Sequence, residues 1–162
     1  MTKIDAITAI TIVRDNLRAN LVDPYVYAGA NARDGSMYIF MDEPHVAARY
    51  PQIELKKVDN PSTVISIGPE YAEREYVYIN IWFYSKNGFT GIVDSTSYKN
   101  AALVEYYMGL IKTTLKSQFN ILHAAGVNGY NHLNTSTVAY DPETQLYFGA
   151  VSIKVEFFVG CE

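Results

Sequence analysis

The sequence EREYVYINIWFY, residues 73–84, alternates side chains of two kinds. Aliphatic residues and one phenylalanine take every second place, and aromatic and amide residues fill the places between them. Because successive side chains of a strand point to opposite faces, this pattern predicts a strand with one aliphatic face against a core. The other face has three alternatives: contact with another protein, burial beneath helices, or the lining of a small-molecule pocket. Contact is favoured because tyrosine and tryptophan carry a polar atom that prefers a wet rim.

An amphipathic helix is predicted ahead of this strand, over residues 2–21. Thr2 and Asp5 have the spacing of a capping box, and Pro24 requires the helix to end before it. The apolar residues recur at steps of three and four, which places them on one helix face: Ile4, Ile7, Ile10, Val13, Leu17 and Leu21. Residues 25–35 are rich in Ala, Gly and Asn and predict a loop or an irregular edge.

A polar loop and a second helix are predicted after the strand. Residues 85–97 contain turn-forming glycines and predict a loop that is long for a simple connection. A helix is then expected from a cap at Ser97 to residue 119, and residues 121–125 extend it to one of the glycines that follow. Its apolar face is formed by Leu103, Tyr107, Leu110, Ile111, Leu115 and Phe119.

Shorter strands complete the predicted sheet. Strand-forming residues bounded by turn signals indicate strands over 37–41, 53–58, 63–67, 133–140 and 145–159. The last two flank Asp-Pro-Glu-Thr at 141–144, a type I turn sequence, and form a hairpin. The order α-β-β-β-(β)-α-β-β predicts an α+β fold with two helices on one mainly antiparallel sheet. No linker or repeat interrupts the chain, so we expect one domain over residues 1–162.

The composition supports a folded domain and excludes several classes of protein. The chain has 162 residues, with 17 acidic and 13 basic side chains and a formal charge of −4. Its 14 tyrosines argue against disorder, and the single Cys161 argues against a disulfide scaffold. No apolar run approaches the roughly 18 residues of a membrane span, and residues 1–9 lack a signal-peptide pattern. The acidic balance argues against sequence-independent binding of nucleic acid.

The sequence offers no catalytic or metal-binding motif. It has no phosphate-binding glycine loop, paired-cysteine motif or nucleophile elbow. His45, His123 and His132 are scattered, and an exposed or capping role is favoured for each over a ligand role. Neighbouring acids such as Asp42 and Glu43 point to opposite faces of a strand and cannot share a substrate. We therefore expect no catalytic residue, no metal site and no cofactor.

Several segments together carry a resemblance to a known family. They are the helix 2–21, the sequence Tyr-Pro-Gln-Ile at 50–53, the strand 76–86 with its Tyr-Ser-Lys ending, the helix 100–119 and the closing hairpin. In order and form they resemble the tail terminator, or tail-completion, proteins of long-tailed bacteriophages and related head-tail joining proteins. Residues 42–52, an additional loop, and the many tyrosines depart from the typical members.

The resemblance implies a non-enzymatic virion protein, located at the tail or head-tail junction and assembled in the host cytoplasm. Such proteins form a ring, usually a hexamer, that caps the tail tube protein and joins it to the head-tail connector, while DNA passes without specific binding. Carried over by position, four aromatic residues become contacts between subunits: Tyr76, Tyr78, Trp82 and Tyr84. Three residues of the loop 85–97 become a surface that docks on the tube or neck: Asn87, Phe89 and Thr90.

Two other functions stay open. Another neck component, a stopper or connector, would share this setting but bind the portal side. A small-molecule-binding or hydrolytic α+β domain would need a pocket that brings at least two of the histidines within hydrogen-bond reach of an acid.

Overall fold

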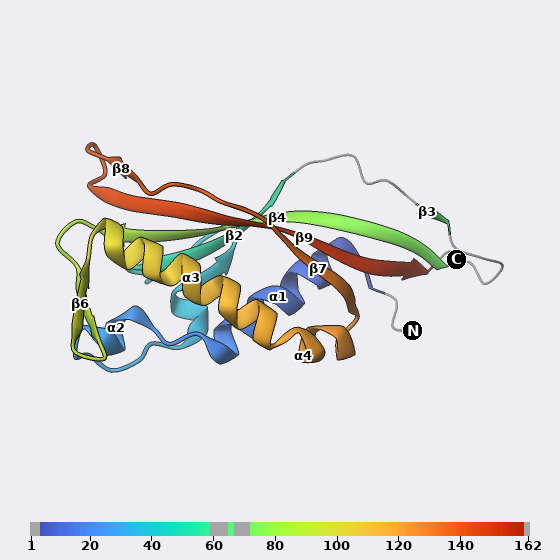
Figure 1. The fold of residues 1–162 in the computed structure, drawn as a ribbon, viewed down its shortest axis with the longest axis horizontal. Helices are drawn as coiled ribbons and strands as arrows, with labels where there is room; N and C mark the ends of the chain where they lie inside the picture. Colours follow the sequence, from blue (N-terminus) through green and yellow to red (C-terminus); the bar gives the residue numbers. More distant parts are fainter. Residues whose placement is uncertain (1–3, 59–64, 67–71, 161–162) are drawn as a thin grey trace.

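A long twisted sheet with its helices on one side forms the body of the protein (Figure 1). The computed structural model describes residues 4–58, 65–66 and 72–160. Within these residues the main sheet has seven strands: β1 (Ile39–Met41), β2 (Gln52–Val58), β3 (Ile65–Ser66), β4 (Ala72–Lys86), β7 (Val127–Thr135), β8 (Ala139–Asp141) and β9 (Leu146–Gly160). A separate hairpin consists of β5 (Thr90–Val93) and β6 (Thr96–Lys99). The predicted α+β class is confirmed.

The two longest strands, β4 and β9, form the spine of the sheet. They pair antiparallel along their whole length, from Ala72 opposite Gly160 to Lys86 opposite Leu146. The full order is β1-β2-β4-β9-β7, with β3 on the same edge of β4 as β2 and β8 on the same edge of β9 as β7. The pair β1–β2 is parallel and every other described pair is antiparallel, as a mainly antiparallel sheet requires.

Helices α1 (Ala6–Asn20) and α3 (Ala101–Ser117) lie on the same side of the sheet (Figure 1). The core is formed between them and alternate residues of the two central strands: Val77, Ile79, Ile81, Phe83, Val151, Ile153, Val155 and Phe157. The Phe83 ring stacks on Tyr107 of α3, with ring centroids 4.4 Å apart. The aliphatic face of 73–84 therefore lies on the core as predicted, and the alternative that buried its aromatic face beneath the helices is wrong.

The first helix begins later than the sequence predicted. Asp5 is its N-cap, and the Asp5 carboxylate accepts a hydrogen bond from the backbone N–H of Thr8 at 2.6 Å. The predicted start at Thr2, which itself lies outside the described residues, is therefore wrong. The helix ends at Asn20, ahead of Pro24 as predicted. Pro24 opens a short helix, α2 (Pro24–Tyr27), inside the predicted loop, because proline needs no N–H partner at the first helical position.

The predicted loop over 85–97 is wrong. The central strand continues to Lys86, and β5 and β6 pair as a hairpin. This hairpin turns at Asp94 and Ser95, which have φ of 45° and 67°, as a type I′ turn requires at both central positions. The turn was missed because Asn-Gly and Asp-Gly are the usual signals for this geometry, and Asp-Ser is not.

The second helix is shorter than predicted at both ends. Ser97 pairs with Ile92 inside the β5–β6 hairpin and does not cap the helix, which begins after Asn100. After a break at Gln118, the residues predicted as an extension belong mainly to a separate helix, α4 (Phe119–Ala124). Gly126, with φ of 116°, follows it, in agreement with a glycine stop.

The closing hairpin is confirmed, although its first arm is divided. The Asp141 carboxylate accepts a hydrogen bond from the backbone N–H of Glu143 at 3.0 Å, and β8 and β9 pair on either side of this turn. The predicted strand 133–140 is split between β7 and β8, and β7 begins earlier, at Val127. The predicted strand 37–41 is shorter than expected, since it yields only β1. Of the predicted strand 63–67 only residues 65 and 66 are described, and they form β3.

Candidate functional site: the open face of the sheet

One face of the sheet carries no helix in the described part of the chain (Figure 1). We call this surface the open face. On β4 it is formed by five half-buried residues: Tyr76, Tyr78, Asn80, Trp82 and Tyr84. Directly opposite them on β9 lie Glu156, Lys154, Ser152, Ala150 and Phe148. The structure thus places the four predicted subunit-contact residues on one continuous surface.

One end of the open face is aromatic. The rings of Trp82, Tyr84 and Phe148 lie within contact of one another, with pairwise centroid distances of 6.0 to 6.2 Å. The Tyr84 hydroxyl donates a hydrogen bond to Glu54 Oε2 at 3.0 Å. Burial, and then the Glu54 charge, raise the pKa of Tyr84 far above its usual value, so this hydroxyl stays protonated at neutral pH.

The other end of the open face is polar and internally paired. Arg74 Nε lies 2.9 Å from Glu156 Oε1. The Lys154 ammonium nitrogen lies 3.7 Å from the centroid of the Tyr76 ring, a cation–π contact. Since these charges already have partners on the same surface, this end has the character of a polar rim beside an aromatic patch.

Two hollows lie beside the aromatic end, at the strand β2. One has a volume of about 430 Å³ and is lined in part by Lys56, Asn80 and Trp82. The second, of about 250 Å³, is lined in part by Phe40 and Tyr50, and Glu54 and Tyr84 line both. Glu54 is the acid in both hollows, and its hydrogen-bond partner is the Tyr84 hydroxyl, not a histidine. The arrangement suits insertion of side chains from a protein partner.

The three predicted docking residues do not form one exposed loop. Phe89 is half-buried, and its ring stacks on Tyr25 with centroids 5.9 Å apart. Thr90 lies on β5, opposite Lys99. Only Asn87 has an exposed side chain, in the turn that follows β4. The surface at this end of the molecule is therefore the β5–β6 hairpin rather than a loop.

The histidines are separated in the structure. His45 lies in the segment between β1 and β2, His123 stacks on Phe119 in α4, and His132 on β7 shares a hydrogen bond with Thr135 Oγ1 at 2.8 Å. Across the described residues no group of His, Cys, Asp and Glu has the arrangement of a metal site. Cys161 lies outside the described residues.

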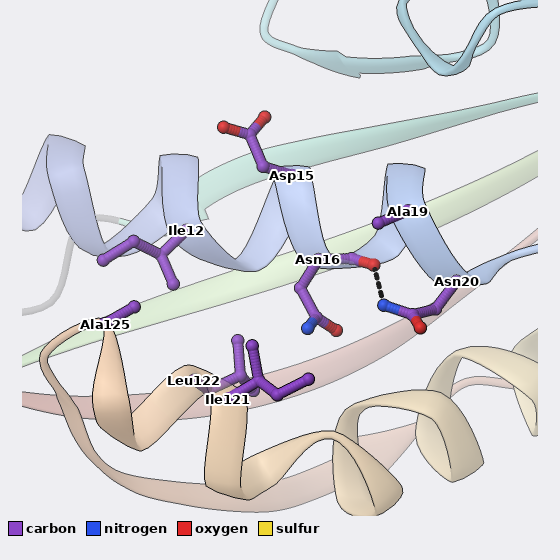
Figure 2. Close-up of a pocket in the computed structure, with 8 residues that line it drawn as sticks. All are labelled: Ile12, Asp15, Asn16, Ala19, Asn20, Ile121, Leu122 and Ala125. Atoms are coloured by element: carbon purple, nitrogen blue, oxygen red, sulfur yellow. Dashed lines mark hydrogen bonds between the residues drawn. The ribbon is translucent and has the colours of Figure 1, made fainter.

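A groove between α1 and α4 was not predicted (Figure 2). Its walls come from residues about a hundred positions apart, Asn16 on one side and Leu122 on the other. One signal in the sequence could have pointed to it. Asn16 lies beside Val13 and Leu17 on the apolar face of the helix, where a polar side chain is unusual unless it has a hydrogen-bond partner.

None of the helices in the described ranges has the length and apolar character that crossing a membrane requires. No model of a known protein family matches the chain, and no curated protein is significantly similar to it in sequence.

Proposed function

We propose that this chain is a non-enzymatic structural subunit of a phage virion, which assembles into a hexameric ring that terminates the tail tube and joins it to the head connector. The observation that carries the proposal is the open face, where Tyr76, Tyr78, Trp82 and Tyr84 lie together without a covering helix in the described structure. In the assembled ring this face is a contact between copies.

Physical chemistry favours contact at such a surface. A contiguous aromatic patch with a polar rim gains free energy when a partner removes it from water. Tyrosine and tryptophan are also the residues enriched at the centres of protein interfaces. The paired charges at the other end, Arg74 with Glu156 and Lys154 over Tyr76, suit the rim, where they lose little hydration.

The edge strand β7 gives a second reason for a defined assembly. Its residues 131–134 are exposed, and an edge strand presents unpaired backbone groups to any passing chain. The ladder to β9 is irregular between Val127 and Gly129 and between His132 and Asn134, which disfavours unlimited strand addition. A closed ring lets each copy meet its neighbour without open-ended growth.

The charge balance supports a channel that does not retain DNA. The formal charge of −4 repels the phosphate backbone, so DNA passes without specific binding. The protein is therefore expected to leave duplex DNA unretarded in a mobility-shift experiment at physiological salt.

Binding to tail tubes tests the proposal. Purified tubes of the parent phage are mixed with the protein and imaged by negative-stain electron microscopy. We expect a ring at one end of each tube and no further growth of the tube. A protein that stays monomeric and leaves tube ends bare would refute the proposal. The same experiment with purified portals separates the neck alternative, because a stopper or connector binds portals and not tubes.

A further inference from the structure

The groove between α1 and α4 lies in the helical layer and is, after the open face, a second surface that could receive a neighbouring copy. It has a volume of about 450 Å³. Figure 2 shows both helices in front of the sheet, with Ile12 and Asn16 of α1 directed toward α4 and Ile121 and Leu122 of α4 directed toward α1. Most of the lining is apolar: Ile12, Ala19, Ile121, Leu122 and Ala125. Ile121 has 59% of its surface exposed, which is costly for a side chain of this kind.

A buried hydrogen-bond acceptor points into this groove. Asn16 is only 7% exposed, and its side-chain Oδ1 accepts no hydrogen bond from the residues that the structure describes. In Figure 2 this side chain extends from α1 toward α4. A buried acceptor without a partner is costly, so an occupant that brings a hydrogen-bond donor is favoured. The groove therefore selects an apolar group that carries one N–H or O–H.

The charge of the groove lining limits which kind of side chain can occupy the groove. Asp15 is the acidic residue of the lining, and its Oδ1 is already engaged by Arg14 Nε at 2.8 Å. In Figure 2 the Asp15 side chain is directed away from α4, so no charged side chain lies between the two walls. An uncharged aromatic side chain with a polar hydrogen fits these requirements.

The aromatic end of the open face carries such a side chain. Trp82 is half-buried, its ring lies beside those of Tyr84 and Phe148, and its indole carries one N–H donor. The groove belongs to the helical layer and the open face lies on the other side of the sheet (Figure 1). A contact between two different surfaces of identical copies is head-to-tail and closes into a ring when the rotation between copies allows it.

We propose that the aromatic end of the open face of one copy packs into the α1–α4 groove of the next copy, with the Trp82 indole N–H donating to Asn16 Oδ1. This inference rests on the proposed ring and names the surface that the open face contacts. It explains in one contact the uncovered aromatic patch, the exposed Ile121 and the unpartnered Asn16.

Mixing two defective variants tests the contact. Trp82→Glu removes the aromatic surface and keeps the groove, whereas Ile121→Glu does the reverse. Each variant alone is expected to be monomeric in sedimentation velocity. A 1:1 mixture should form a heterodimer, because one of the contacts remains intact. In that contact the Ile121→Glu variant supplies Trp82, and the Trp82→Glu variant supplies the groove. Val26→Glu is the matched control, since Val26 is 42% exposed on α2, outside both surfaces and outside the β5–β6 hairpin, and this variant should assemble like the wild type.

The possible outcomes separate this contact from the proposed function. If the wild type forms the ring and Ile121→Glu does so equally well, the groove contact is wrong and the ring stands. If both variants are monomeric and their mixture stays monomeric, each surface pairs in another way and the contact is again wrong. A wild type that is monomeric with and without tubes overturns both proposals. Should Trp82→Glu fail to fold, as judged by its circular dichroism, Trp82→Ala replaces it in the same mixture.

Asn16→Leu tests the hydrogen bond itself. Leucine keeps a side chain of similar size but removes the unpartnered acceptor, so the monomer should become more stable toward urea. Assembly should weaken about 2- to 10-fold at the same time, because the indole N–H loses its acceptor. A purely structural role for Asn16 would change monomer stability and leave the assembly constant unmoved, and that result would overturn the proposed hydrogen bond.

Discussion

Arg33 joins three segments that are distant in the chain. Its Nε and Nη2 lie 2.9 and 2.7 Å from the carboxylate oxygens of Asp23, and it donates to the carbonyl oxygens of Arg49 and Pro51. Its guanidinium carbon lies 3.7 Å from the centroid of the Tyr25 ring. The Asp23 side chain is 1% exposed, so the removal of Arg33 leaves a buried charge without its partner.

Arg33→Ala should therefore destabilise the protein by about 3–5 kcal/mol, measured by urea denaturation at pH 7. Arg14→Ala is the control, because Arg14 pairs with the exposed Asp15 and such pairs contribute at most about 1 kcal/mol. Equal losses for the two variants would show that the buried pair does not have the structural role assigned to it.

Asp5 gives a prediction on pH at the same scale. Hydrogen bonds from the Thr8 side chain and backbone N–H hold the pKa of Asp5 below its usual value of about 3.9. Because the folded-state pKa is the lower one, this stabilisation is complete above the unfolded-state pKa and is lost as the pH falls through the folded-state pKa. Asn also caps helices but does not titrate in this range, so Asp5→Asn should lose less stability than the wild type between pH 5 and pH 2. Parallel losses in thermal denaturation would contradict this.

The two faces of β4 give a prediction at the scale of elements. Ile79 is fully buried, whereas its neighbour Tyr78 lies on the open face. Ile79→Ala should cost about 2–5 kcal/mol of folding free energy through the cavity it leaves. Tyr78→Ala should cost much less in the monomer but should weaken assembly about 10-fold or more. Urea denaturation at low protein concentration measures the loss of stability, and sedimentation velocity at high concentration measures the loss of assembly. If Tyr78→Ala lost the stability and Ile79→Ala lost only the assembly, the assignment of the two faces would be reversed.

The elements also show what the sequence could predict. The strands 73–84 and 145–159 were predictable because their period-two alternation persists along two long central strands that bury one face. The hairpin β5–β6 was not, because each arm has four residues and its turn requires positive φ at Asp94 and Ser95. The groove between α1 and α4 was beyond sequence reasoning, since tertiary packing alone brings Asn16 near Leu122. The four aromatic residues that β4 contributes to the open face were predicted because they belong to one strand, whereas Phe148 on β9 was not predicted.

At the scale of the whole molecule, the described helices lie on one side of the sheet and leave its aromatic side uncovered (Figure 1). A single copy thus carries two unlike surfaces, the open face and the α1–α4 groove, and each lacks a partner within the described chain. A head-to-tail ring covers both surfaces in every copy, while an isologous dimer covers one of them.

Multi-angle light scattering of the purified protein measures whether this chain forms the proposed ring. The molar mass of one copy is 18.2 kDa. A species of about six copies is expected, either alone or after addition of tail tubes, because a closed head-to-tail contact repeats until the ring is complete. A mass of 18.2 kDa at every concentration, unchanged by tubes, would contradict it.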